Sequence, residues 1–261
     1  MNTDEQSISK RPLIAAWQVA NLRLTAFPTP AVRIEEPTWW SDLLGEPPEV
    51  RVSQPRMGGQ QEEGPFEEGK LVLTIQPTRV DWLFAVAEDK EPNVGEITAI
   101  GAFPELLDKF LTQMLHWFEL ETCPSAQRLA FGAVLLQPVE SRQEGYRQLS
   151  AYLPCVQLDP AGSSDFFYQI NRPKNSSSGM AGLRINRLSK WSVAVTRGSV
   201  LSFGQVSTLH TLGSEHFACR LELDINTAPG FSGELTQEEL PVIFQELVDL
   251  GKEIAQEGDI S

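Results

Sequence analysis

The sequence predicts an α+β protein with mostly antiparallel sheets and two long amphipathic helices, and three observations lead to that prediction. Short apolar runs with alternating polar positions recur along the chain and are typical of half-buried strands. Two segments, 103–120 and 236–257, instead repeat apolar residues every three or four positions, which is typical of helices packed on one side. Of the 261 residues, 41% are hydrophobic, so the chain can bury a core without disulfides or metals.

The N-terminal part of the chain predicts a tail, a strand and a long irregular segment. Residues 1–12 are polar and contain no apolar run, so we expect a flexible tail. Residues 13–27 predict a strand that ends at Pro28. The segment 33–69 is rich in Pro, Gly and Glu, which predicts a loose acidic insertion, interrupted by a short helical turn that the two tryptophans at 39–40 anchor on the core.

A hairpin and a long helix follow this insertion. Residues 71–75 and 80–86 are apolar runs separated by a short segment with the turn-forming Pro77, so they predict a β-hairpin. The first long helix is expected at residues 103–120, where apolar side chains recur at helical spacing and Pro104 occupies the first turn.

The second half of the chain predicts further strands, a short helix at 141–153 and a long C-terminal helix. The strands are expected at residues 129–139, 165–171, 183–186, 191–196 and 217–225. Those at 183–186 and 191–196 are interpreted as a pair. Thr236 and Glu239 have the spacing of a capping box, so they predict the start of the last helix.

An internal repeat suggests how these elements are grouped. A strand, a turn and a strand with a tryptophan occur at 70–86 and again at 183–196, and an amphipathic helix follows each unit. This order predicts two related β-rich lobes, each closed by a helix; the alternative is a chance likeness between two hairpins. The expected units are a flexible tail at 1–12, an N-terminal lobe at 13–122 with the insertion at 33–69, and a C-terminal lobe at 123–257.

Acidic and basic residues are distributed unevenly along the chain. The net charge is −14, yet residues 166–214 contain no Asp or Glu and carry +6. The basic residues of this stretch are Arg172, Lys174, Arg184, Arg187, Lys190 and Arg197. They are the residues that we expect to bind a partner or an anion, provided that the stretch folds into one exposed surface.

Three interpretations of this cationic stretch remain open. It docks on the acidic surface of another protein or of a second copy of the chain, because complementary charge steers association. It pairs internally with the surplus carboxylates. In the third interpretation, residues 172–197 bind nucleic acid or a phosphorylated ligand, and the serines at 176–178 offer hydroxyl donors to the anion beside Arg172 and Lys174.

The sequence contains no recognisable catalytic constellation, so we expect a protein that is not an enzyme and that has no cofactor and no metal. The histidines lack the spacing of a metal pair; they are His116, His210 and His216. Ser232 lacks the strand–turn–helix setting of a nucleophile, and no phosphate-binding glycine loop occurs. Glu222 and Asp224 share one face of a strand and are interpreted as its solvated side, although such a pair can bind a metal or catalyse hydrolysis. A hydrolase with scattered catalytic residues is therefore an alternative.

The cysteines and the apolar runs favour the cytoplasm. Cys123, Cys155 and Cys219 are odd in number and far apart, which predicts buried free thiols in a reducing compartment. The N-terminus does not have the pattern of a signal peptide, and no run approaches the roughly 20 apolar residues that cross a bilayer, so we expect no membrane association.

Three segments of the C-terminal half form a recognisable pattern. They are Arg128-Leu-Ala-Phe-Gly-Ala-Val-Leu-Leu, a helix that ends in Tyr152-Leu153-Pro154, and Leu-Glu-Leu-Asp-Ile-Asn at 221–226, which the last helix follows. The pattern resembles a family of uncharacterised bacterial proteins of about this length. The resemblance implies an α+β fold and carries no activity with it.

These observations together predict a non-catalytic accessory or scaffold protein of a bacterial multiprotein complex. It would bind its partner through segregated basic and acidic surfaces, because the charge is unevenly distributed and no catalytic residues are recognisable.

Overall fold

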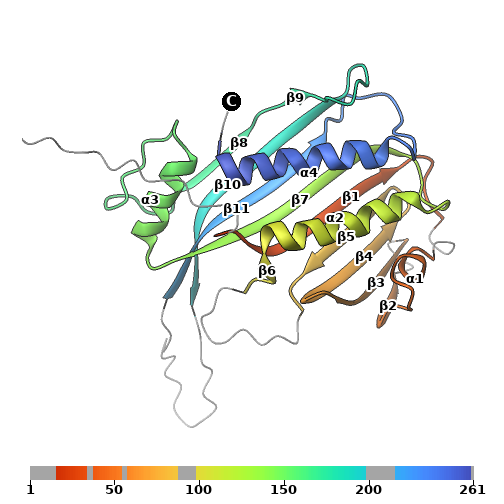
Figure 1. The fold of residues 1–261 in the computed structure, drawn as a ribbon, viewed down its shortest axis with the longest axis horizontal. Helices are drawn as coiled ribbons and strands as arrows, with labels where there is room; N and C mark the ends of the chain where they lie inside the picture. The colour runs from red at the N-terminus through yellow and green to blue at the C-terminus, as the bar shows by residue number, and fades with distance from the viewer. Residues whose placement is uncertain (1–15, 34–37, 55–57, 88–97, 198–214, 260–261) are drawn as a thin grey trace, which may run out of the picture.

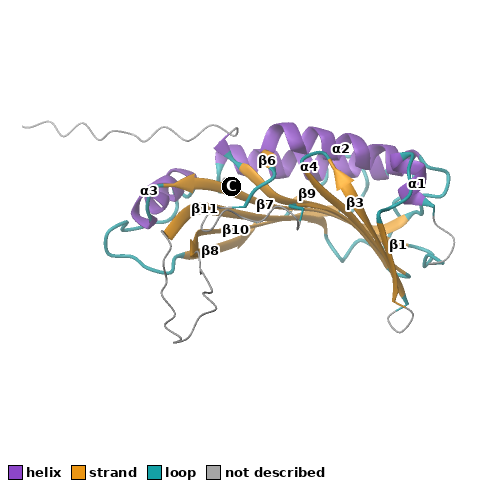
Figure 2. Ribbon diagram, turned by 90° about the horizontal axis from the view of Figure 1, so that it is seen from below, coloured by secondary structure: helices purple, strands orange, loops and turns teal. Residues whose placement is uncertain are grey.

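The described residues of the chain form one open antiparallel sheet of 11 strands with helices on one of its faces (Figures 1 and 2). This is a computed structural model, and it describes residues 16–33, 38–54, 58–87, 98–197 and 215–259. The predicted α+β class and mostly antiparallel sheet are confirmed by this arrangement. The expected tail at 1–12 lies outside the described residues.

The sheet is not built in sequence order. Its strands are β1 (Gln18–Pro28), β2 (Val50–Gln54), β3 (Gly59–Phe66), β4 (Gly69–Gln76), β5 (Arg79–Ala85), β6 (Gly101–Ala102), β7 (Ala126–Val139), β8 (Phe167–Asn171), β9 (Lys174–Asn175), β10 (Arg184–Arg197) and β11 (Glu215–Thr227). Along the sheet the order is β2-β3-β4-β5-β1-β7-β11-β10-β8, with β6 paired to β1 and β9 to β10. The centre thus brings together β1, β7, β11 and β10, which are far apart in the sequence.

The helices lie on the same side of this sheet (Figure 2). They are α1 (Trp39–Leu44), α2 (Phe103–Glu119), α3 (Arg142–Tyr152) and α4 (Leu240–Glu257). The two long helices α2 and α4 run across the sheet, while α3 covers one end of it and α1 the other (Figure 1). No helix in the described part of the chain has the length and apolar character needed to span a bilayer.

The core fills the layer between the sheet and the long helices. One stripe of α2 is buried; it consists of Phe103, Leu106, Leu107, Phe110, Leu111, Met114, Trp117 and Phe118. Trp117 packs against Trp82 of β5 with ring centroids 6.1 Å apart, and Phe244 of α4 packs against Phe131 of β7 at 6.2 Å. Gly251 lets α4 approach the sheet closely, since a Cβ there would lie 2.8 Å from the Phe131 ring. Burial of this apolar area supplies most of the stability of the fold.

The prediction of a loose insertion at 33–69 is wrong for the part that the structure describes. Residues 38–54 and 58–69 contain α1, β2 and β3, and β3 pairs with β4 along its whole length. Glu62 is fully buried and forms an ion pair with Arg51 of β2 at 2.8 Å, while Gln60 donates to the same carboxylate oxygen. The composition of this segment did not predict its strands, because pairing with neighbouring strands and the ion pair with Arg51 stabilise a segment that is too polar to fold alone.

The expected strand pair at 183–196 is also wrong, because these residues form the single long strand β10. Instead of folding back on itself, β10 pairs with β11 on one side and with β8 and β9 on the other. The mostly polar residues 187–190 are interpreted from the sequence as the turn of a hairpin, yet their side chains alternate between the two faces of one strand, where they have different surroundings.

Candidate binding face

The two faces of the sheet differ in what covers them. Successive side chains of a strand point to opposite faces, so every strand contributes to both. One face packs under α2 and α4 and carries buried residues such as Leu24, Phe131 and Leu223. The other, which we call the helix-free face, carries the alternate residues, such as Arg23 and Asp224, and no described helix lies on it (Figure 2).

The helix-free face is cationic although the chain is acidic. Among the described strands it carries seven basic side chains, Arg23, Lys70, Arg79, Arg128, Arg184, Lys190 and Arg220. It carries four carboxylates there, Glu63, Asp81, Glu222 and Asp224. The resulting charge is +3, whereas the four helices, with nine carboxylates and four basic side chains, sum to −5 with histidines neutral.

Four of these seven cations have carboxylate partners on the same face. Lys70 lies 3.6 Å from Glu63, and Arg79 lies 2.6 Å from Asp81. Glu222 accepts both Lys190, at 3.6 Å, and Arg220, at 3.0 Å. The remaining three, Arg23, Arg128 and Arg184, have no carboxylate within ion-pair distance among the described residues.

Arg128 is nevertheless held in place. Its guanidinium donates to the Thr227 carbonyl at 3.2 Å and lies 5.1 Å from the centre of the Phe27 ring, a cation–π arrangement. Neither contact neutralises its charge. Arg128 therefore adds a fixed positive charge to the helix-free face near the start of β7.

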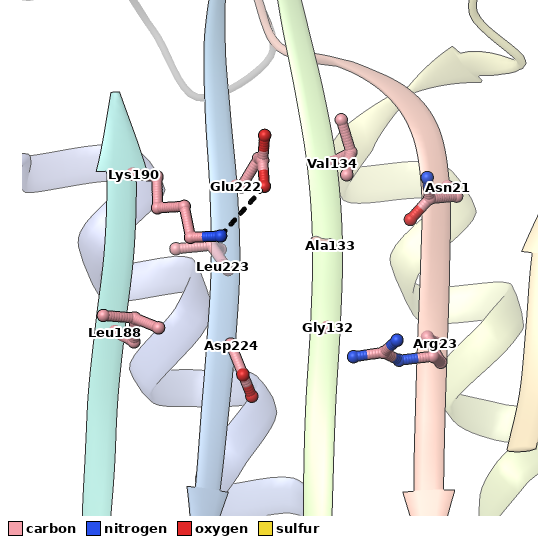
Figure 3. A pocket seen from close by; sticks show the side chains of 10 residues that line it. All are labelled: Asn21, Arg23, Gly132, Ala133, Val134, Leu188, Lys190, Glu222, Leu223 and Asp224. Atoms are coloured by element: carbon pink, nitrogen blue, oxygen red, sulfur yellow. Dashed lines mark ion pairs between the residues drawn. The ribbon is translucent and has the colours of Figure 1, made fainter. Parts of the chain in front are cut away.

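A hollow lies at the middle of this face, where β1, β7, β11 and β10 run side by side (Figure 3). Its volume is about 270 Å³, and its floor is Gly132 of β7, which has no side chain. Arg23 is the cross-strand neighbour of Gly132 on β1, and Asp224 is its neighbour on β11. The Arg23 side chain reaches over the glycine, since a Cβ at position 132 would lie 3.3 Å from a guanidinium nitrogen (Figure 3).

Asp224 is oriented by a chain of side-chain amides. The Asn226 amide donates to the Asp224 carboxylate at 3.0 Å, the Asn186 amide donates to Asn226 at 3.0 Å, and the Asn171 amide donates to Asn186 at 3.1 Å. No cation of the described chain forms an ion pair with Asp224. The amide chain fixes the direction of this carboxylate without compensating its charge.

The six residues predicted to form one cationic surface do not form one. Arg172 and Arg187 lie on the helix side, where they pair with Asp259 at 2.5 Å and with Glu253 at 3.7 Å. Lys174 is exposed beside α4, whereas Arg184 and Lys190 lie on the helix-free face. Arg197 ends β10, about 40 Å along the strand from Arg184, and its side chain is outside the described residues. Alternation along β10 divides consecutive cations between two faces, so a charge count along the sequence could not find the surface.

Sequence reasoning missed Arg23 and Arg128 because each is a single cation in an apolar run. Their significance depends on strand register, which places both on the same face as Lys190 and Arg184. A local signal existed only for Arg23, which occupies a polar position of the partly alternating segment Leu22-Arg-Leu-Thr25.

Two of the serines at 176–178 do bind an anion, but this anion is a carboxylate of the same chain. The Ser176 hydroxyl donates to the Glu246 carboxylate at 2.5 Å, and the Ser177 amide and hydroxyl donate to it at 2.6 and 2.8 Å. Glu246 belongs to α4, so this contact ties the loop to the helix. The anion-binding interpretation of this loop is thereby replaced by an internal contact.

The end of α4 is fixed by Asp259. Its carboxylate accepts from Arg172 at 2.5 Å, from the Tyr168 hydroxyl at 2.6 Å and from the Cys155 thiol at 3.3 Å. These donors, Arg172 above all, lower the pKa of Asp259 to about 2. The same carboxylate raises the pKa of Tyr168, although burial is the larger cause.

The three cysteines have different surroundings. Cys123 and Cys219 are buried free thiols, as predicted, and burial raises the pKa of each to about 12. Cys155 is also a free thiol, but it is exposed, so the predicted burial is wrong for this residue. The polar neighbours of Cys155, Tyr168 and Asp259, come from distant parts of the sequence, which explains why the local pattern did not reveal its position.

The candidate catalytic residues are not brought together where the structure describes them. His116 is exposed on α2, His216 lies on β11, and His210 is outside the described residues. Ser232 is exposed in the segment before α4. The described ranges contain no group of three His, Cys, Asp or Glu residues placed to hold a metal ion. Glu222, proposed as part of a carboxylate pair, is neutralised by two cations.

No model of a known protein family matches this chain, and no curated protein matches it at a significant level. No relative therefore indicates a ligand or a partner. The charges and the shape of the helix-free face are the features from which a function can be inferred.

Proposed function

We propose that this protein is a non-catalytic accessory or scaffold protein that binds an acidic partner protein on its helix-free face. The observation that carries the proposal is the charge of +3 on that face, in a chain with a net charge of −14. Three of its arginines lack carboxylate partners among the described residues. A partner carboxylate can therefore bind them without first breaking an internal ion pair.

The segregation of charge also orients the partner. An acidic surface is repelled by the helices, which sum to −5, and attracted by the opposite face. Complementary potentials of this kind raise association rates and suppress wrong orientations more than they raise final affinity. The segregated surfaces expected from the sequence are thus retained in the proposal, but as two faces of one sheet instead of two stretches of sequence.

The test measures binding of a fluorescent oligoglutamate peptide by anisotropy. Reversing the three unpaired arginines, in R23E/R128E/R184E, should weaken binding about tenfold or more, because each exposed charge contact contributes a few tenths to one kcal/mol. The control K109E/R147E/K252E changes the net charge equally but alters helix residues. Equal loss in both variants would show that only net charge matters, and the face would then have no specific role.

Nucleic acid or another phosphoanion is the alternative ligand, favoured by the same three arginines and by Phe167, which is 60% exposed on the edge strand β8. Four carboxylates on the face oppose it, because they repel a continuous phosphate backbone. A single-stranded oligonucleotide of the same charge as the peptide decides between them. Tighter, salt-sensitive binding of the oligonucleotide, lost in R23E/R128E/R184E, would favour the alternative.

We also propose that the chain consists of two related halves, 13–122 and 123–257. Each half begins with a central strand, β1 or β7, and ends with a long helix, α2 or α4. The last long strand of each half, β5 or β11, pairs with the first strand of that half, and β1 and β7 meet at the middle of the sheet. A cytoplasmic location is part of the proposal, since Cys155 is an exposed thiol without a disulfide.

A further inference from the structure

The hollow over Gly132 contains two charges of opposite sign that are not within ion-pair distance of each other. Arg23 and Asp224 lie in one cross-strand row, with Gly132 between them, and neither forms an ion pair with a described residue. Two strand spacings, about 9.6 Å, separate the backbones of β1 and β11. Since Gly132 has no side chain, the Arg23 guanidinium extends over it, and no side chain of β7 stands between the guanidinium and the Asp224 carboxylate (Figure 3).

The neighbours of the two charges make the site selective. On the β11 side, Glu222 adds a second carboxylate, although Lys190 and Arg220 compensate it. A purely acidic segment would place a carboxylate against Asp224 and be repelled there. A purely basic segment would place a cation against Arg23 and be repelled there. Only a segment that carries both signs satisfies the two sides of the hollow.

We propose that this hollow binds an extended segment of the partner polypeptide in which an acidic and a basic side chain are two residues apart. In an extended chain, side chains at positions i and i+2 point the same way and are about 6.6 Å apart, and flexible Glu and Lys side chains span the remaining distance. The carboxylate then pairs with Arg23 and the ammonium with Asp224 across Gly132. This inference rests on the proposed function: the whole face attracts an acidic partner, and the hollow selects its charge pattern.

The test compares two fluorescent peptides of identical composition, rich in Glu and with a single Lys. One has a central Glu-Ser-Lys, and the other has the Lys at one end, so their net charges are equal. Wild-type protein should bind the first peptide about fivefold more tightly, as expected for one additional partly exposed charge pair. The preference should disappear in Asp224→Asn, which removes the charge and keeps the shape, and in Gly132→Val, which fills the hollow.

Arg128→Gln is the matched control, because Arg128 lies on the same face but outside the hollow. It should weaken both peptides equally and leave the fivefold preference intact. The variant Asp224→Lys provides a further measurement, since it makes both sides of the hollow positive and should reverse the preference toward the peptide with an all-glutamate centre. Far-ultraviolet circular dichroism verifies that each variant is folded.

The outcomes separate the two proposals. If both peptides bind equally and R23E/R128E/R184E abolishes both, the face binds acidic partners but the hollow does not read a charge pattern, and this inference is wrong. If neither peptide binds the wild-type protein, the proposed function and this inference both fail. A preference that survives Asp224→Asn would also overturn the inference.

Discussion

The two faces of this sheet are formed by alternate residues of the same strands, and these residues have different surroundings. Under α2 and α4, large apolar side chains are fully buried, and their neighbours determine which residues fit. On the helix-free face, the alternate residues of the same strands carry charges, amides and a hollow floored by glycine. The stability of the fold and the proposed binding therefore depend on alternate residues of the same strands, so substitutions at adjacent positions should alter them independently.

The largest expected effect is an aromatic truncation on the covered face. Trp117→Ala removes a fully buried side chain that contacts Trp39 and Trp82, so it should lower the free energy of unfolding by about 3–5 kcal/mol. Phe167→Ala on the helix-free face removes a 60% exposed ring and should change it by less than about 1 kcal/mol. Urea unfolding measures both, and similar losses would contradict the difference between the faces.

A smaller effect, dependent on pH, is expected at the end of α4. The folded-state pKa of Asp259 is lowered to about 2 from the ordinary 3.8, chiefly because Arg172 donates to the carboxylate. The ionised form therefore stabilises the folded chain by about 1–2 kcal/mol at neutral pH, because Arg172 is one-third exposed and solvent screens part of the attraction, and this contribution is lost as the pH falls from about 4 to about 2. Asp259→Asn should lower the free energy of unfolding by that amount at pH 7, and its difference from the wild-type protein should become smaller as the pH falls from about 4 to about 2.

The control for this prediction is Asp224→Asn on the helix-free face, which has no ion pair among the described residues and should have little effect on unfolding at either pH. A deficit in Asp259→Asn that does not change between pH 7 and pH 2 would show that the charge of Asp259 does not stabilise the fold.

Two glycines offer a matched comparison with a still smaller effect. Gly251→Ala places a Cβ 2.8 Å from the Phe131 ring and should destabilise the protein by about 1 kcal/mol, after the better helix propensity of alanine offsets part of the overpacking. Gly132→Ala meets only the flexible Arg23 side chain, at 3.3 Å, and should be neutral or slightly stabilising. Thermal unfolding of both variants measures the difference, and an equal shift in Tm would contradict it.

The smallest effect is on reactivity and leaves stability unchanged. Only Cys155 should react with a thiol reagent in the folded protein at about pH 8, because the pKa of Cys123 and of Cys219 is raised to about 12 by burial. All three should react after unfolding, and Cys155→Ser should abolish the native reaction. Rapid labelling of a second thiol in the folded state would contradict the burial of Cys123 and Cys219.

Local patterns predicted the elements far better than they predicted the site. The hairpin of β4 and β5, the helix α2 and the strand β11 follow from periodicity and turn residues, which act over a few positions. Prediction failed at β3, where Glu62 is buried beside Arg51, and at β10, whose polar residues resembled a turn. In both cases pairing with a neighbouring strand stabilises a segment whose own sequence does not favour a strand.

The sequence by itself determined that this is an acidic α+β protein with uneven charge, because composition and short-range periodicity are properties of the chain. Only the tertiary structure decided which charges share a surface. Arg23, Gly132 and Asp224 become neighbours through the register of three antiparallel strands from distant parts of the chain. A shift of one residue in either pairing would move these side chains to the covered face, so the site is a property of register and cannot be read from any local segment.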